Sequence, residues 1–120
     1  MIEPNMATML GFLMTDASFS REELQGALSE VVLDSFNAIS VDGDESTSDT
    51  VVLVSSCAKS GTTLADFREA LREVCQDLAA QIVHNGEGTR HVIRVSVTGA
   101  SDDATARRVA KAVVNGPLFK

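Results

Sequence analysis

Residues 8–15 read Thr8-Met9-Leu10-Gly11-Phe12-Leu13-Met14-Thr15, an apolar run between two threonines that predicts a buried β-strand. The lead before this run contains Pro4 and few apolar residues, which disfavours a helix there. A second run, Val51–Ser55, predicts another strand, apolar on both faces and therefore interior. Residues 92–98 alternate apolar and polar side chains and predict a third strand with one more exposed face.

The first helical pattern follows the first strand. Ser20 and Glu23 have the spacing of a capping box, in which each side chain bonds the backbone N–H of the other residue. An apolar stripe follows at helical spacing, and we expect it to fade near Asn37; its members are Leu24, Leu28 and Val31.

Two more helical patterns complete the chain. Thr63 predicts the N-cap of a long helix that Gly86 or Gly88 can end, with apolar positions at Leu64, Phe67, Leu71, Val74, Leu78 and Ile82. Ser101 is expected to cap a final helix that ends at Asn115-Gly116-Pro117. The elements therefore alternate, which predicts an α/β fold in β-α-β-α-β-α order, a layered sheet covered by helices.

Composition restricts the class of protein. The chain of 120 residues is at most one domain, and 44% hydrophobic with 22% charged residues is typical of a globular protein. A net charge of −7 argues against nucleic acid and anionic membranes as partners. No apolar stretch is long enough for a membrane span or signal peptide, so we expect a cytoplasmic location. Cys57 and Cys75 are expected to be free thiols, Cys75 as a small hydrophobe, although a disulfide stays open.

The sequence predicts no metal and no cofactor. An acidic cluster at Asp42, Asp44, Glu45 and Asp49 misses the calcium-loop pattern, because Leu53 stands where the closing glutamate is needed. We expect instead a loop between helix and strand in which Asp49 and Thr50 hydrogen-bond the backbone. His84 and His91 do not have zinc-site spacing, and neither glycine-rich segment is a phosphate loop or a dinucleotide fingerprint.

The pair Ala7-Thr8 suggests a nucleophile. If the chain breaks between them, Thr8 gains an α-amine with a pKa of about 8, which can act as the base for its own hydroxyl. A chain of this kind is a self-activated acyl-transfer enzyme. The alternative is an ordinary threonine in a loop that enters a buried strand.

Three sequence motifs help to decide whether Thr8 is a nucleophile or an ordinary threonine. They are, in chain order, Met1–Leu10, Asp34–Thr50 and His84-Asn85-Gly86-Glu87-Gly88. In order and spacing they resemble the ornithine acetyltransferase family, the glutamate N-acetyltransferases of arginine biosynthesis, and the resemblance runs from Met1 to Lys120. Three departures stand out: Ser48 replaces the usual Asn, Asn85 the usual Asp, and residues 89–91 the usual Ala-Thr-Lys.

The resemblance implies a site and a mechanism. Thr8 would cleave the Ala7–Thr8 bond, accept acetyl from N-acetylornithine and pass it to glutamate in a ping-pong cycle, while Glu87 contacts the amino-acid substrate. A bifunctional parent would also use acetyl-CoA. The implied fold is the layered sandwich shared with self-cleaving aminopeptidases.

The resemblance also implies an assembly. Residues 1–7 would belong to the upstream alpha chain of the precursor and residues 8–120 to part of the beta chain, in a heterotetramer of cleaved chains. The oxyanion hole, a substrate-binding lysine and further substrate contacts are expected outside these residues, so the isolated piece should be inactive. Two other functions stay open: a self-cleaving amide hydrolase, and a non-catalytic binding or assembly module of the same fold.

Overall fold

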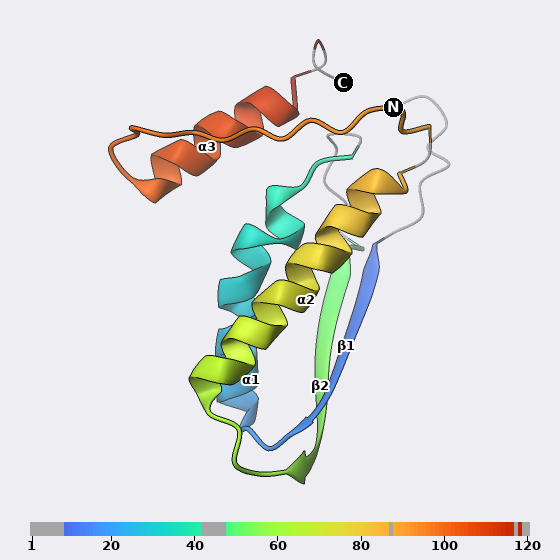
Figure 1. Ribbon diagram of the computed structural model, residues 1–120, viewed down its shortest axis with the longest axis vertical. Helices are drawn as coiled ribbons and strands as arrows, with labels where there is room; N and C mark the ends of the chain where they lie inside the picture. Colours follow the sequence, from blue (N-terminus) through green and yellow to red (C-terminus); the bar gives the residue numbers. More distant parts are fainter. Residues whose placement is uncertain (1–8, 42–47, 87, 117, 119–120) are drawn as a thin grey trace.

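The computed structural model describes residues 9–41, 48–86, 88–116 and 118. Its elements are β1 (Leu10–Ala17), α1 (Arg21–Val31), the short 3₁₀ turns η1 (Val32–Asp34) and η2 (Phe36–Ala38), β2 (Thr50–Lys59), α2 (Leu64–His84) and α3 (Asp103–Val114). In the described part, β1 and β2 form a two-stranded parallel sheet, with α1 as the crossover between them (Figure 1).

The register between β1 and β2 is regular over most of their length. Pairing runs from Leu10 opposite Thr50 to Thr15 opposite Ser55, and then shifts so that Ala17 lies opposite Lys59. Because side chains alternate across a strand, the residues at odd positions of β1 and of β2 up to Ser55 face the helices, and those at even positions face away.

Two of the three predicted helix starts are confirmed, those of α1 and α2. At α1, the Glu23 N–H donates to Ser20 Oγ at 3.2 Å and the Ser20 N–H donates to Glu23 Oε2 at 2.8 Å, which is the predicted capping box. At α2, the Asp66 N–H donates to Thr63 Oγ1 at 3.1 Å. These bonds satisfy amides that would otherwise lack partners in the first turn of each helix.

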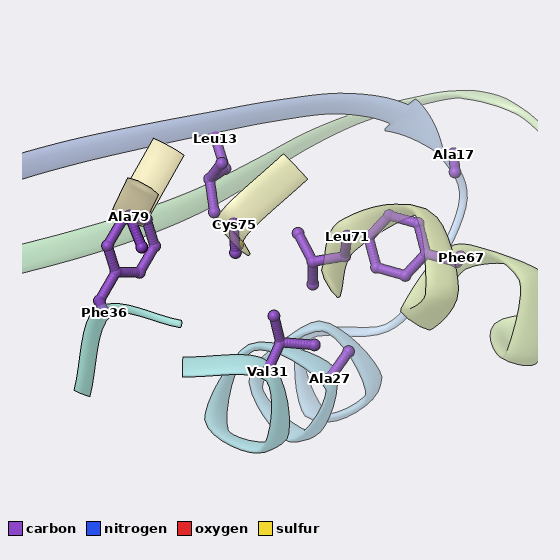
Figure 2. Close-up of a cluster of buried hydrophobic side chains, with 9 residues drawn as sticks. All are labelled: Leu13, Ala17, Ala27, Val31, Phe36, Phe67, Leu71, Cys75 and Ala79. Atoms are coloured by element: carbon purple, nitrogen blue, oxygen red, sulfur yellow. The ribbon is translucent and has the colours of Figure 1, made fainter. Parts of the chain in front are cut away.

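The core lies between one face of the sheet and the helices α1 and α2. Figure 2 shows side chains from both strand and helices pointing into this layer, namely Leu13, Ala17, Ala27, Val31, Phe36, Phe67, Leu71, Cys75 and Ala79. The predicted apolar stripe of α2 is therefore shifted in part, because Cys75 and Ala79 are buried while Val74 is 50% exposed.

The predictions of a buried strand over residues 8–15 and an interior strand over Val51–Ser55 are wrong for one face of the sheet. Leu13 is 6% exposed, but Phe12 and Met14 on the other face are 65% and 84% exposed. Val54, opposite Met14, is 54% exposed. No described element covers this outer face, which we define as Phe12, Met14, Val52 and Val54.

The predicted third strand over residues 92–98 is also wrong, so the observed order is β-α-β-α-α. These residues form no strand. A strand needs a hydrogen-bonded neighbour, and the described chain provides none at this position.

α3 is attached to the body through polar contacts. Its N-cap is Asp102 instead of the predicted Ser101, whose hydroxyl donates to Asp102 Oδ2 at 2.9 Å. Arg107 Nη1 donates to the Leu33 carbonyl and to Asp34 Oδ1, and the residues of the helix are half-buried or exposed, none fully buried. The helix ends at Val114 with Asn115 as C-cap, as predicted. Across the described residues, no helix has the length and apolarity to cross a membrane.

Candidate functional site

The three predicted site residues, Ala7, Thr8 and Glu87, lie outside the described residues. The structure therefore bears on the site through the neighbours of these residues in the sequence. Met9 follows Thr8, and Gly86 and Gly88 flank Glu87.

The backbone of Met9 makes two hydrogen bonds, one to a side chain and one to the backbone. Its N–H donates to Asp49 Oδ1 at 2.9 Å, and its carbonyl accepts the Thr50 N–H at 2.9 Å. The Thr50 hydroxyl in turn donates to the Ser48 carbonyl at 3.2 Å. The prediction that Asp49 and Thr50 bond the backbone is confirmed, and their shared partner is the residue that follows Thr8.

The two glycines beside Glu87 have different constraints. A Cβ at Gly86 would lie 2.7 Å from Thr89 Oγ1 and 3.3 Å from Val41 Cγ1, which leaves little space for a side chain. Gly88 has a φ of +73°, in the left-handed region that favours glycine. α2 ends at His84 with Asn85 as C-cap, so Gly86 directly follows the cap as predicted, whereas the expected positive φ occurs at Gly88 and not at Gly86.

These neighbours lie toward one end of the molecule. The amino ends of β1 and β2 and the carboxyl end of α2 point the same way (Figure 1), and Val41 at the end of the α1 crossover approaches Gly86. A parallel sheet in which α2 returns along the strands produces this arrangement, so elements far apart in sequence meet near the start of β1.

Lys111 is a residue of this region that the sequence analysis missed. Its Nζ donates to the Ile39 carbonyl at 2.8 Å, two residues before Val41. The lysine side chain therefore connects α3 to the segment that approaches Gly86. Nothing in the local sequence indicates a partner 72 residues away.

A separate groove of about 340 Å³ lies beside α1 and the free edge of β2. Leu24, Leu28 and Leu53 line its apolar part, and Arg21 and Cys57 contribute to its wall. It contains none of the residues next to Thr8 or Glu87, so it is distinct from the candidate site.

The cysteines and acidic residues do not form a metal centre in the described part of the chain, where no cluster of three metal-ligating side chains occurs. Both cysteines are free thiols. Burial raises the pKa of the Cys75 thiol, which agrees with its predicted role as a small hydrophobe. Three members of the acidic cluster fall among residues 42–47, outside the described residues.

Comparison with known proteins gives a consistent result. The ArgJ family model matches residues 1–120. The chain is 50% identical to a glutamate N-acetyltransferase from Methanopyrus kandleri and 47% identical to an arginine biosynthesis bifunctional protein ArgJ from Halalkalibacterium halodurans, in each case over its full length. It spans 32% and 31% of those two relatives, about a third of their length.

A solved structure agrees with the sequence comparisons. The crystal structure of the arginine biosynthesis bifunctional protein ArgJ from Bacillus halodurans superposes with a TM-score of 0.86 at 45% identity. The match covers 94% of this chain and 56% of that one. With the family model matched from end to end, the conclusion is that this chain belongs to the ArgJ family.

Proposed function

We propose that this chain is part of a glutamate N-acetyltransferase of arginine biosynthesis in which Thr8 carries the acetyl group. The structural observation that best supports this proposal is the backbone of Met9, the residue directly after Thr8, which is hydrogen-bonded through both its N–H and its carbonyl. The names of relatives that are 47% and 50% identical support the reaction class. Because the chain spans about a third of those relatives, the activity belongs to the whole parent protein.

Self-cleavage at Ala7–Thr8 generates the nucleophile. The Thr8 hydroxyl oxygen attacks the Ala7 carbonyl carbon, and the bond from that carbon to the Thr8 nitrogen breaks as the nitrogen takes the hydroxyl proton. Water hydrolyses the resulting ester, which leaves a carboxylate on Ala7 and a free hydroxyl and amine on Thr8. The amine has an ordinary pKa of about 8, close enough to neutral to act as a base.

Acetyl transfer then takes two steps. The Thr8 amine takes the hydroxyl proton as the oxygen attacks the acetyl carbonyl of N-acetylornithine, and ornithine leaves with that proton. The amine of glutamate attacks acetyl-Thr8, forms N-acetylglutamate and restores the hydroxyl. In a bifunctional parent, acetyl-CoA replaces N-acetylornithine as donor. The Glu87 carboxylate binds an ammonium group of the amino-acid substrate.

The same proposal covers the assembly. The segment that ends at Ala7 stays with the chain that begins at Thr8, and two such pairs form a cytoplasmic heterotetramer. Donors for the oxyanion come from other parts of the parent, and stabilisation of this kind contributes several kcal/mol to catalysis. We therefore expect residues 1–120 alone to transfer no acetyl group.

The test is Thr8→Ala in the full-length parent. We expect a single uncut chain and loss of acetyl transfer, because both steps need the hydroxyl. Thr62→Ala is the matched control, since Thr62 is an exposed threonine in the loop before α2 and should be cut and active. Intact mass, the N-terminal residue and N-acetylglutamate formation are the measurements.

The outcomes separate the alternatives. Cleavage and turnover that survive Thr8→Ala would contradict the proposal. A cut, active protein that releases acetate at the same rate with and without glutamate would indicate an amide hydrolase. An uncut wild-type protein without turnover would indicate a non-catalytic module.

A further inference from the structure

We infer that Asp49 is a positioning residue for self-cleavage: its carboxylate holds the Met9 amide and so orients the peptide unit attached to Thr8. This inference rests on the proposed function, since it concerns the reaction at Ala7–Thr8. It adds to that function a residue forty positions away from the nucleophile's neighbour.

The first step is the geometry around Met9. The Asp49 side chain and the Thr50 backbone satisfy the donor and the acceptor of this one residue, each at 2.9 Å. Strand pairing begins only at the next position, where Leu10 lies opposite Thr50. Asp49 therefore extends the sheet's hydrogen bonding by one residue beyond the ladder, toward Thr8.

The second step is that the bond acts on a peptide plane. The Met9 N–H lies in one rigid plane with the carbonyl and the Cα of the preceding residue, because the peptide bond does not rotate freely. A group that fixes the direction of this N–H restricts rotation of the plane attached to Thr8. Nucleophilic attack is sensitive to such restriction, since a misplacement of about 1 Å can slow a reaction about 100-fold.

The third step is the choice of a carboxylate. A bond to an ionised acceptor is shorter and stronger than one between neutral groups. The pair joins residues 49 and 9, so it is tertiary and forms only when β1 and β2 are paired. The Asp49 side chain is solvent-exposed, so replacing it leaves no buried group without a partner.

The experiment measures the cleavage rate of the full-length parent carrying Asp49→Leu, Asp49→Asn or Asp49→Glu. Timed synthesis is stopped with denaturant, and the ratio of precursor to chain beginning at Thr8 is read by mass. We expect Asp49→Leu to slow cleavage at least about tenfold, since it removes the acceptor at similar size. Asp49→Asn keeps an amide oxygen and should recover much of the rate, whereas Asp49→Glu displaces the oxygens and should also be slow.

The matched controls are Asp16→Leu and Asp16→Asn. Asp16 is another exposed acid at an end of β1, where it pairs with Lys59 Nζ at 2.8 Å, away from Met9. These variants should shift the melting temperature as much as those at Asp49 and cleave at the wild-type rate. A purely structural role for Asp49 would slow both sets together and would overturn the inference.

The remaining outcomes distinguish a failure of this inference from a failure of the proposed function. Asp49→Leu and Asp49→Glu that both cleave at the wild-type rate would overturn the role of Asp49 and leave the proposed function intact. If Asp49→Leu does not fold, the contrast between Asp49→Asn and Asp49→Glu decides, and equal rates would overturn the inference. A wild-type protein that is never cut would refute the proposed function itself.

Discussion

Glu87 lies between two glycines that both restrict substitution, one by space and one by a φ of +73°. At this position we predict that Glu87→Gln raises the KM for the amino-acid substrate about tenfold or more, because a bond to a charged group is worth about 1.5–3 kcal/mol. Cleavage at Ala7–Thr8 should stay unchanged, since it needs no bound amino acid. Steady-state kinetics of the full-length parent, with intact mass, measure both.

Glu69→Gln is the control for Glu87→Gln. Glu69 is an exposed glutamate on α2, away from the glycine pair, and its replacement should leave KM within about twofold. An unchanged KM in Glu87→Gln would remove Glu87 from the substrate site.

Single residues differ in how far the sequence could predict them. The capping pair of Ser20 and Glu23 and the buried Cys75 follow from local spacing, and both are confirmed. That Asp49 accepts the hydrogen bond from the Met9 N–H could not be predicted, because this pairing depends on the register between two strands, which no local pattern gives. Thr8 and Glu87 rest on a resemblance, and their roles stay predictions.

At the scale of elements, α1 offers a test of its capping box. The hydrogen bond from the Ser20 N–H lowers the pKa of Glu23 below its ordinary value of 4.5. A carboxylate with a lowered pKa in the folded state stabilises at pH above the unfolded value, and this contribution is lost as the pH falls through the lowered pKa.

We therefore predict that Glu23→Gln speeds amide hydrogen exchange in the first turn of α1 at pH 7 and matches the wild type once the wild-type carboxyl is protonated. Glu22→Gln is the control, because Glu22 occupies the same first turn without the bond to Ser20. Equal exchange for wild type and Glu23→Gln at pH 7 would show that the charged cap contributes nothing. Mass spectrometry of exchanged peptides measures the exchange rate of the variant relative to that of the wild type.

Elements were predictable where their determinants are local. Helices α1 and α2 begin at the predicted caps because a side chain three residues away closes each first turn. Residues 92–98 carry the right alternation and still form no strand, since strand formation depends on a neighbour that periodicity cannot supply. The cap of α3 at Asp102 differs by one residue because two adjacent residues can both cap.

At the scale of the whole molecule, the outer face of the sheet remains apolar and uncovered by described residues. Met14 and Val54 lie opposite each other and are 84% and 54% exposed. We predict that residues 1–120 expressed alone associate in a concentration-dependent manner, and that Met14→Lys with Val54→Lys reduces the association. Val109→Lys on α3 is the control and should leave it unchanged.

Light scattering across a concentration series measures this association. A mass that stays monomeric at every concentration would contradict the prediction. The sequence predicts interior strands, and the outer face does carry the apolar residues that an interior strand would bury. The expectation failed because an apolar strand face is buried only where another layer packs on it, and no described element packs on this face.

The bond between Met9 and Asp49 has a consequence for protein synthesis. On a ribosome that adds about 5–20 residues per second, Met9 is made roughly two to eight seconds before its partner, which comes forty residues later. Until then the nascent chain has no acceptor for the Met9 amide. If scission depends on this bond, as inferred above, it is postponed until β2 has emerged and paired, and the Ala7–Thr8 bond stays intact up to that point.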